Sequence, residues 1–226
     1  MTLFIHSPSW FFGIDAVLQS VTVFVAIFLF FMSYKIYKIL KEKSFLYFSA
    51  GFLSISLAYG IKIFADMFTY KNMGGNFTPW INLVIYRLST LEFVNIFGHL
   101  AFRFLVLLGF LILLITLLKI NDGRIIFLLM YFVFITSAFS AWSFLLFQTT
   151  LTVFAGVLGI YYLFHYIQNQ KKLVLYSLMG FAFLFAAQVS LMFTYFFENQ
   201  MFVVGHVLQA IGFIILFITY LMVLRK

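Results

Sequence analysis

The stretch Glu92-Phe-Val-Asn-Ile-Phe-Gly-His-Leu-Ala-Phe-Arg103 is the part of the sequence that says most about the fold. It opens an apolar run that continues to Lys119. Its four polar side chains are spaced three, four and four residues apart: Glu92, Asn95, His99 and Arg103. At 3.6 residues per turn, this spacing puts all four on one face of a helix. Because a polar face on an apolar helix is costly in lipid, we expect it to face protein or a water-filled cavity.

The composition around this stretch is that of a membrane protein. The 226-residue chain is 65% hydrophobic and 9% charged, and its mean hydropathy is +1.13. Soluble domains carry roughly 25% charged residues, and no soluble core could bury this much apolar surface. We therefore expect a multi-pass protein of the cell membrane, surrounded by the lipid bilayer and without a soluble domain. The chain has no cysteine, which excludes disulfides, thiolate nucleophiles and iron–sulfur ligation.

Seven apolar runs separated by short polar turns predict an all-α fold with seven transmembrane helices. The runs cover about 14–39, 44–68, 90–119, 125–139, 144–167, 173–196 and 201–226. Thr78-Pro79 is a good N-cap and N1 pair, and it starts an amphipathic stretch near 79–88 that we predict to lie on the membrane surface. Ser89-Thr-Leu-Glu92 matches a capping box, so the third long helix is predicted to begin at Thr90.

The basic residues predict the orientation of these helices. Ten of the fourteen lie at one end of the predicted bundle: Lys35, Lys38, Lys41, Lys43, Lys119, Arg124, Lys171, Lys172, Arg225 and Lys226. Because lysine and arginine concentrate on the cytoplasmic side, the N-terminus is predicted to lie outside and the C-terminus inside. The net charge of +8 is therefore interpreted as an orientation signal, and no nucleic-acid partner is expected.

An internal repeat is the most informative long-range pattern. Five positions recur at one constant spacing: Tyr37, Tyr47, Gly51, Phe52 and Ala58 recur as Tyr166, Tyr176, Gly180, Phe181 and Ala187. Gly98-His99 recurs as Gly205-His206 at a shorter spacing, and the difference is close to the length of the 69–90 insertion. We therefore predict one transmembrane domain over 1–226 in a 3+1+3 arrangement. Its parts are a first triplet (1–119, with the surface helix near 79–88), a linker helix (120–142) and a second, parallel triplet (143–226).

Counting along the helices predicts a polar layer near the outer membrane boundary. His99 lies 20 residues before Lys119, and His206 lies 19 before Arg225, so both are roughly 30 Å from the basic end. Lys62 reaches a similar level, and Asp15, Gln19 and Gln148 belong to the same half. We predict an outward-facing polar pocket lined by Glu92, Asn95, Gln188, Gln209 and Asp66.

The first functional hypothesis is a b-type cytochrome-like electron-transfer subunit with no catalytic activity of its own. In it His99 and His206 hold a haem b iron as axial ligands, since a duplicated helix triplet places equivalent residues opposite each other. Arg103 and Lys62 would lie near the haem propionates. In the alternative interpretation, the two histidines only make hydrogen bonds between neighbouring helices.

Two further hypotheses use the same residues differently. The outer pocket could belong to a module that binds or transports a small solute, or the chain could be a non-catalytic structural subunit of a membrane complex. No Gly-rich phosphate loop, nucleophile motif or pair of catalytic carboxylates is visible in the sequence. Because no soluble domain is expected, we predict other membrane subunits or further copies of the chain as partners.

Overall fold

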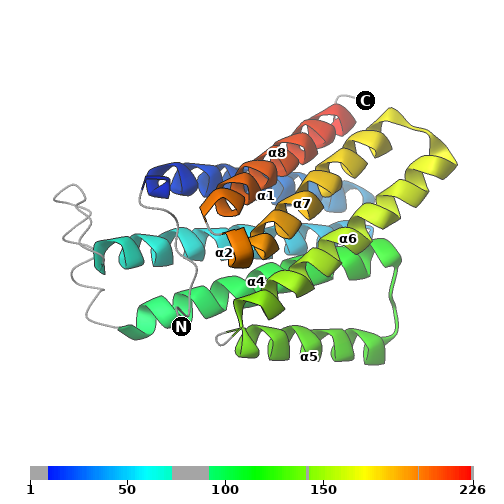
Figure 1. Ribbon diagram of the computed structural model, residues 1–226. Coiled ribbons are helices and arrows are strands. Elements are labelled where there is room, and N and C mark those ends of the chain that lie inside the picture. The colour runs from blue at the N-terminus through cyan, green and yellow to red at the C-terminus, as the bar shows by residue number, and fades with distance from the viewer. Residues whose placement is uncertain (1–9, 73–91, 141–142, 198, 225–226) are drawn as a thin grey trace.

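The computed structural model describes residues 10–72, 92–140, 143–197 and 199–224. Within these residues it contains seven helices and no strand (Figure 1). The helices are α1 (Phe12–Leu40), α2 (Lys43–Asn72), α4 (Glu92–Leu118), α5 (Gly123–Phe139), α6 (Phe144–Asn169), α7 (Lys172–Phe197) and α8 (Asn199–Leu224). The surface helix predicted near 79–88 and the predicted helix start at Thr90 lie outside the described residues.

Six of these helices are long and apolar enough to cross a membrane: α1, α2, α4, α6, α7 and α8. The remaining helix, α5, is apolar but has only 17 residues. It rises about 25 Å, which is less than the roughly 30 Å of a bilayer's hydrocarbon core. The all-α fold and the multi-pass membrane character are thus supported, whereas the predicted seven spans are matched by six helices and one shorter one.

The helix ends follow from local sequence chemistry. The side chains of Asp122 and Ser143 accept hydrogen bonds from backbone N–H groups in the first turns of α5 and α6, at 2.8 and 3.4 Å. At the other end of two helices, Lys41 and Gln170 adopt the left-handed conformation that ends a helix. Their N–H groups donate to the carbonyls of Tyr37 and Tyr166, each at 2.8 Å. Because Tyr37 and Tyr166 are counterparts in the predicted repeat, α1 and α6 end at equivalent positions.

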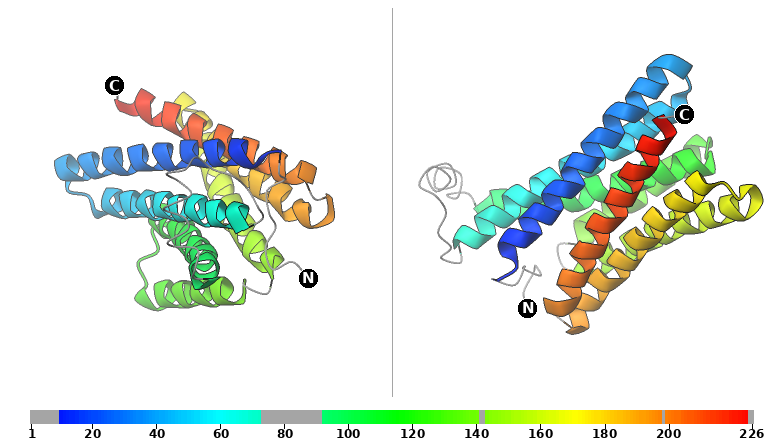
Figure 2. Two further views of the ribbon diagram at one scale, coloured as in Figure 1. Left: turned by 90° about the vertical axis from the view of Figure 1, so that its left-hand side faces the viewer. Right: turned by 90° about the horizontal axis from the view of Figure 1, so that it is seen from above.

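The six long helices form a closed ring. Helices α1, α2 and α4 pack side by side as one triplet, and α6, α7 and α8 as the other. Contacts of α1 with α8 and of α4 with α6 join the triplets (Figures 1 and 2). Helix α5 lies outside the ring and packs mainly against α4, with a smaller contact to α6. Apolar side chains fill the middle of the ring, with Leu29, Leu107, Phe110, Phe181 and Phe213 among the most deeply buried.

Glycines set the closest helix approaches within each triplet. A Cβ on Gly109 of α4 would lie 2.8 Å from the backbone oxygen of Gly51 in α2. A Cβ on Gly212 of α8 would lie 3.0 Å from the backbone oxygen of Gly180 in α7. Gly51 and Gly180 are counterparts in the predicted repeat, and each contacts a glycine of the third helix in its own triplet. The repeat itself stays a prediction, and pairing Gly109 with Gly212 shifts the third helices by one turn relative to pairing the histidines.

Candidate functional site

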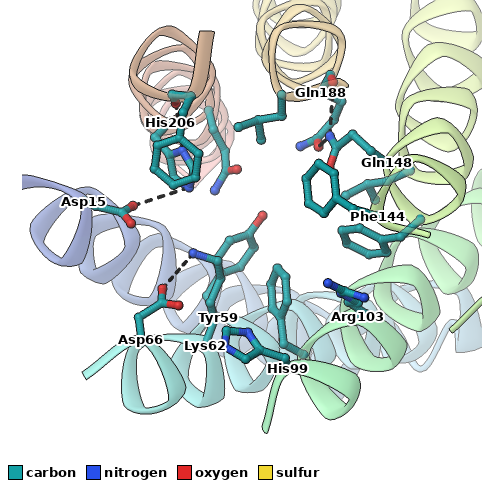
Figure 3. Close-up of a pocket in the computed structure, with 16 residues that line it drawn as sticks. Asp15, Tyr59, Lys62, Asp66, His99, Arg103, Phe144, Gln148, Gln188 and His206 are labelled. Atoms are coloured by element: carbon teal, nitrogen blue, oxygen red, sulfur yellow. Dashed lines mark hydrogen bonds and ion pairs between the residues drawn. The ribbon is translucent and has the colours of Figure 1, made fainter. Parts of the chain in front are cut away.

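One pocket draws side chains from all six helices of the ring (Figure 3). Its cavity has a volume of about 70 Å³. The polar lining comprises Asp15, Tyr59, Lys62, Asp66, His99, Arg103, Gln148, Gln188, His206 and Gln209. The apolar lining comprises Phe102, Phe144, Phe147, Leu151, Leu191 and Phe202. Asp15 lies in the first turn of α1 and Lys38 in its last, so the pocket is at the end of the bundle away from the lysine-rich turns.

A partly buried acidic cluster forms the α1–α2 wall of the pocket. The amide nitrogen of Gln19 donates to Asp15 Oδ1 at 2.7 Å and to Asp66 Oδ2 at 3.2 Å. Lys62 Nζ donates to the same Asp66 oxygen at 2.9 Å, as an ion pair one helical turn apart. Asp15 and Gln19 are only 2% and 1% exposed. Two carboxylates are therefore held close together in the pocket lining, beside one lysine.

His206 joins this cluster from α8 across the junction of the two triplets. Its Nδ1 lies 2.9 Å from the carbonyl oxygen of Phe202, and its Nε2 lies 3.4 Å from Asp15 Oδ1. The side chain is almost completely buried. Both ring nitrogens of His206 are thus directed at protein oxygens.

Arg103 forms the opposite wall, at the junction of α4 and α6. Its Nη1 donates to the carbonyl oxygen of Ser140 and, at 3.2 Å, to the hydroxyl of the same residue. Ser140 is the C-cap of α5, where a positive charge is favoured by the helix dipole. The guanidinium also lies 6.0 and 5.7 Å from the ring centres of Phe144 and Phe147. A buried cation therefore faces the acidic cluster from across the cavity (Figure 3).

Amide groups complete the lining. Gln148 of α6 donates to the side-chain oxygen of Gln188 in α7 at 2.6 Å, and to its backbone oxygen at 3.1 Å. Gln209 of α8 donates to the hydroxyl of Thr22 at 3.4 Å. The pocket thus offers charges on two walls and neutral hydrogen-bonding groups between them.

Seven of the nine residues named in the sequence-based site come together around this pocket: His99, His206, Arg103, Lys62, Asp66, Gln188 and Gln209. The side chains of Glu92 and Asn95 lie outside the described part of the structure, although α4 includes both positions. Sequence reasoning placed Asp15 and Gln148 in the same outer half as these residues but did not name them in the site, and it did not assign Tyr59. A signal was present, because Tyr59 shares a helix face with Lys62 and Asp66, and Gln148 repeats Gln19.

The two histidines of the haem hypothesis both reach the pocket from different helices. Both line the pocket, and Figure 3 shows them on different sides of it, with Tyr59 and Lys62 drawn between them. Among the described residues, no group of three or more His, Cys, Asp or Glu side chains is placed to hold a metal ion. Axial ligation by His206 through Nε2 would require its contact with Asp15 to open.

No protein family, curated protein or solved structure matches the chain. The class of protein is therefore inferred from the fold and the pocket alone. It is a multi-pass helical membrane protein whose ring of six helices carries a small, charged pocket near one end.

Proposed function

We propose that the protein binds a small polar solute in this pocket and serves as a solute-binding or transport module of the membrane. The observation that carries the proposal is the pocket itself, to which each of the six long helices contributes at least one polar side chain. Ionisable groups inside a membrane are costly and are concentrated in substrate and ion pathways. All six long helices place a polar group around one cavity. A bound ligand explains this arrangement better than contacts between helices alone do.

The position of the pocket relative to the triplets favours transport over passive binding. The contact of Asp15 with His206 crosses the α1–α8 junction, and the contact of Arg103 with Phe147 crosses the α4–α6 junction. Transporters built from repeats carry their substrate site at the interface of the repeats, and one repeat rocks against the other around it. A solute bound here would touch both triplets, so its binding would depend on how the triplets are oriented.

A thiol-accessibility experiment tests whether the pocket is an aqueous site. The chain has no cysteine, so single cysteines report without background. Phe144 lines the pocket, and Phe127 is a 73% exposed apolar residue of α5 that we expect to face lipid. A water-soluble methanethiosulfonate should react with Phe144→Cys, because water ionises the thiol, and should not react with the matched control Phe127→Cys. A pocket cysteine as inert as the control would contradict the proposal and favour a structural polar cluster.

The haem hypothesis is a second candidate, and one observation favours it: His99 and His206 line the same pocket. Haem, if bound, would supply one-electron chemistry, with these two residues as its ligands. It has less support than a solute, because both ring nitrogens of His206 are directed at protein oxygens. An absorption spectrum of the purified protein separates the two candidates: a Soret band with sharp reduced α and β bands would favour the cytochrome.

A further inference from the structure

The contact between His206 and Asp15 lacks a proton donor. The carbonyl oxygen of Phe202 can only accept a hydrogen bond, so Nδ1 of His206, 2.9 Å away, must carry the proton. In the neutral ring, Nε2 then presents a lone pair. The oxygen that it faces at 3.4 Å belongs to the Asp15 carboxylate, which also accepts. Two acceptors therefore face each other at the edge of the cavity.

The surrounding cluster has an excess of negative charge and of acceptors. Asp15 and Asp66 carry two negative charges, and Lys62 supplies one positive charge. The amide of Gln19 reaches between the two carboxylates with its nitrogen, because they can only accept. Its oxygen is buried and has no hydrogen-bond partner among the described residues. With His206 neutral, this cluster thus lacks one positive charge, and the contact between Asp15 and His206 lacks an N–H donor.

The other described pocket residues near His206 add no further full positive charge to this cluster. Helix α1 contributes Asp15, α2 contributes Tyr59, Lys62 and Asp66, and α4 contributes His99. The polar group that α7 adds to the pocket is the uncharged Gln188. The only other full charge on the lining of the described pocket is Arg103, which lies on the far wall.

We propose that the solute is a small organic monocation whose ammonium group lies beside the contact of Asp15 with His206 and donates to both acceptors. This inference rests on the proposed solute-binding function and names the class of solute. An ammonium group carries three N–H donors, so it can serve several acceptors at once, whereas a proton on His206 would serve only the contact with Asp15. The ring of Phe202, whose centre lies 4.2 Å from that of His206, lines the same pocket and adds aromatic surface beside the cation.

Arg103 fixes the orientation and the charge of this solute. Its guanidinium would repel a second cationic group, so the far end of the solute must be uncharged or carry an acceptor. That end meets Phe144 and Phe147, which favour an apolar chain. The cavity volume of about 70 Å³ limits the solute to a few heavy atoms in this conformation.

Isosteric probes test the charge preference in the purified, full-length protein. We would measure the melting temperature at a fixed pH and ionic strength with n-propylammonium, propionate or 1-propanol, and with sodium chloride as the reference. Above its Kd, each tenfold rise in propylammonium should raise Tm by roughly 3–5 °C. Propionate and propanol should leave Tm at its sodium chloride value. A shift with propionate or propanol but not with propylammonium would overturn the cation, yet it would leave a solute-binding pocket in place.

Two carboxylate variants locate the effect. Asp15→Asn removes the charge that faces His206, and should raise the Kd for propylammonium at least tenfold. Asp122→Asn is the matched control, because Asp122 lies at the other end of the bundle and asparagine caps helices as well as aspartate does. Unchanged propylammonium binding in Asp15→Asn would place the cation elsewhere and refute the proposed position. If no probe shifts Tm in the unmodified protein and the pocket cysteine is inert as well, the solute-binding function itself fails.

Discussion

At the scale of single residues, the Gln148–Gln188 pair gives the clearest stability prediction. The two side chains are 2% and 1% exposed and share a hydrogen bond of 2.6 Å. Gln148→Leu keeps the volume but removes the donor, so the buried oxygen of Gln188 loses that bond. We expect the free energy of unfolding to fall by about 1–3 kcal/mol, measured by reversible denaturation in detergent.

The double variant is the control for this prediction. In Gln148→Leu/Gln188→Leu both partners are apolar, so the unsatisfied side-chain oxygen is gone, and part of the lost stability should return. If the free energy of unfolding of the double variant falls by the sum of the two single decreases, the two side chains are not coupled and the prediction is wrong. The backbone oxygen of Gln188, which Gln148 also contacts at 3.1 Å, limits how complete the recovery can be.

The sequence could place residues at the right depth but could not pair them. Counting turns from Lys119 and Arg225 puts His99 and His206 at one level, and the structure brings both to one pocket. The contact of His206 with Asp15 has no sequence signal, because it depends on which faces α1 and α8 turn toward each other. For the same reason the bond from Arg103 to Ser140 could not be foreseen, since it requires α5 to end beside α4.

At the scale of helices, glycines predict where substitution is costly. A Cβ on Gly109 would lie 2.6 Å from a side-chain carbon of Ile55 and 2.8 Å from the backbone oxygen of Gly51, so α2 and α4 would have to separate. We expect Gly109→Ala to lower the free energy of unfolding by about 1–3 kcal/mol. Gly60→Ala is the matched control in α2, where a Cβ would meet nothing within 4 Å.

The control should be neutral or stabilising by up to about 1 kcal/mol, because alanine is the better helix former. Denaturation midpoints of the two variants, measured in the same detergent, give the comparison. Equal changes in stability at both positions would mean that helix propensity alone determines the effect of alanine. The close approach of α2 and α4 would then not require glycine.

Helix bounds were largely predictable because the polar turns that separate the apolar runs are short and distinct. The predicted end near 167 and the observed end at Asn169 differ by two residues, since Gln170 ends α6 in a left-handed conformation that no local pattern marks. The end of α2 was predicted near 68 and lies at Asn72, because its polar last turn continues the helix. Apolar composition alone predicted a seventh span, but α5 is short for one.

At the scale of the whole molecule, the ring arrangement could be predicted only in part. The constant spacing of the repeated residues indicated the two triplets, and the contacts of Gly51 with Gly109 and of Gly180 with Gly212 agree with them. The sequence alone does not define the register of the third helices, because a Gly-His pair in an apolar run can match one turn out of place. If the glycine contacts define the repeat, the structural counterpart of His206 is Arg103. Nothing in the sequence repeat predicted that α5 lies outside the ring.

The orientation of the molecule in the membrane is a prediction that the charge distribution makes and that labelling can decide. The lysine-rich turns are predicted to face the cytoplasm because lysine and arginine cross the membrane poorly during insertion. Asn121 and Asn169 are exposed at that end, and Gln200 is exposed near the start of α8, at the pocket end. In a chain without cysteine, each can be replaced by a single reporter thiol.

In intact cells, an impermeant maleimide should label Gln200→Cys and should reach Asn121→Cys and Asn169→Cys only after the membrane is opened. The two shielded positions act as mutual controls, because they lie in different turns of the same end. The reverse pattern would turn the pocket toward the cytoplasm. The proposed solute would then enter from inside the cell, while the contacts of Asp15, His206 and Arg103 that define its binding site would stay the same.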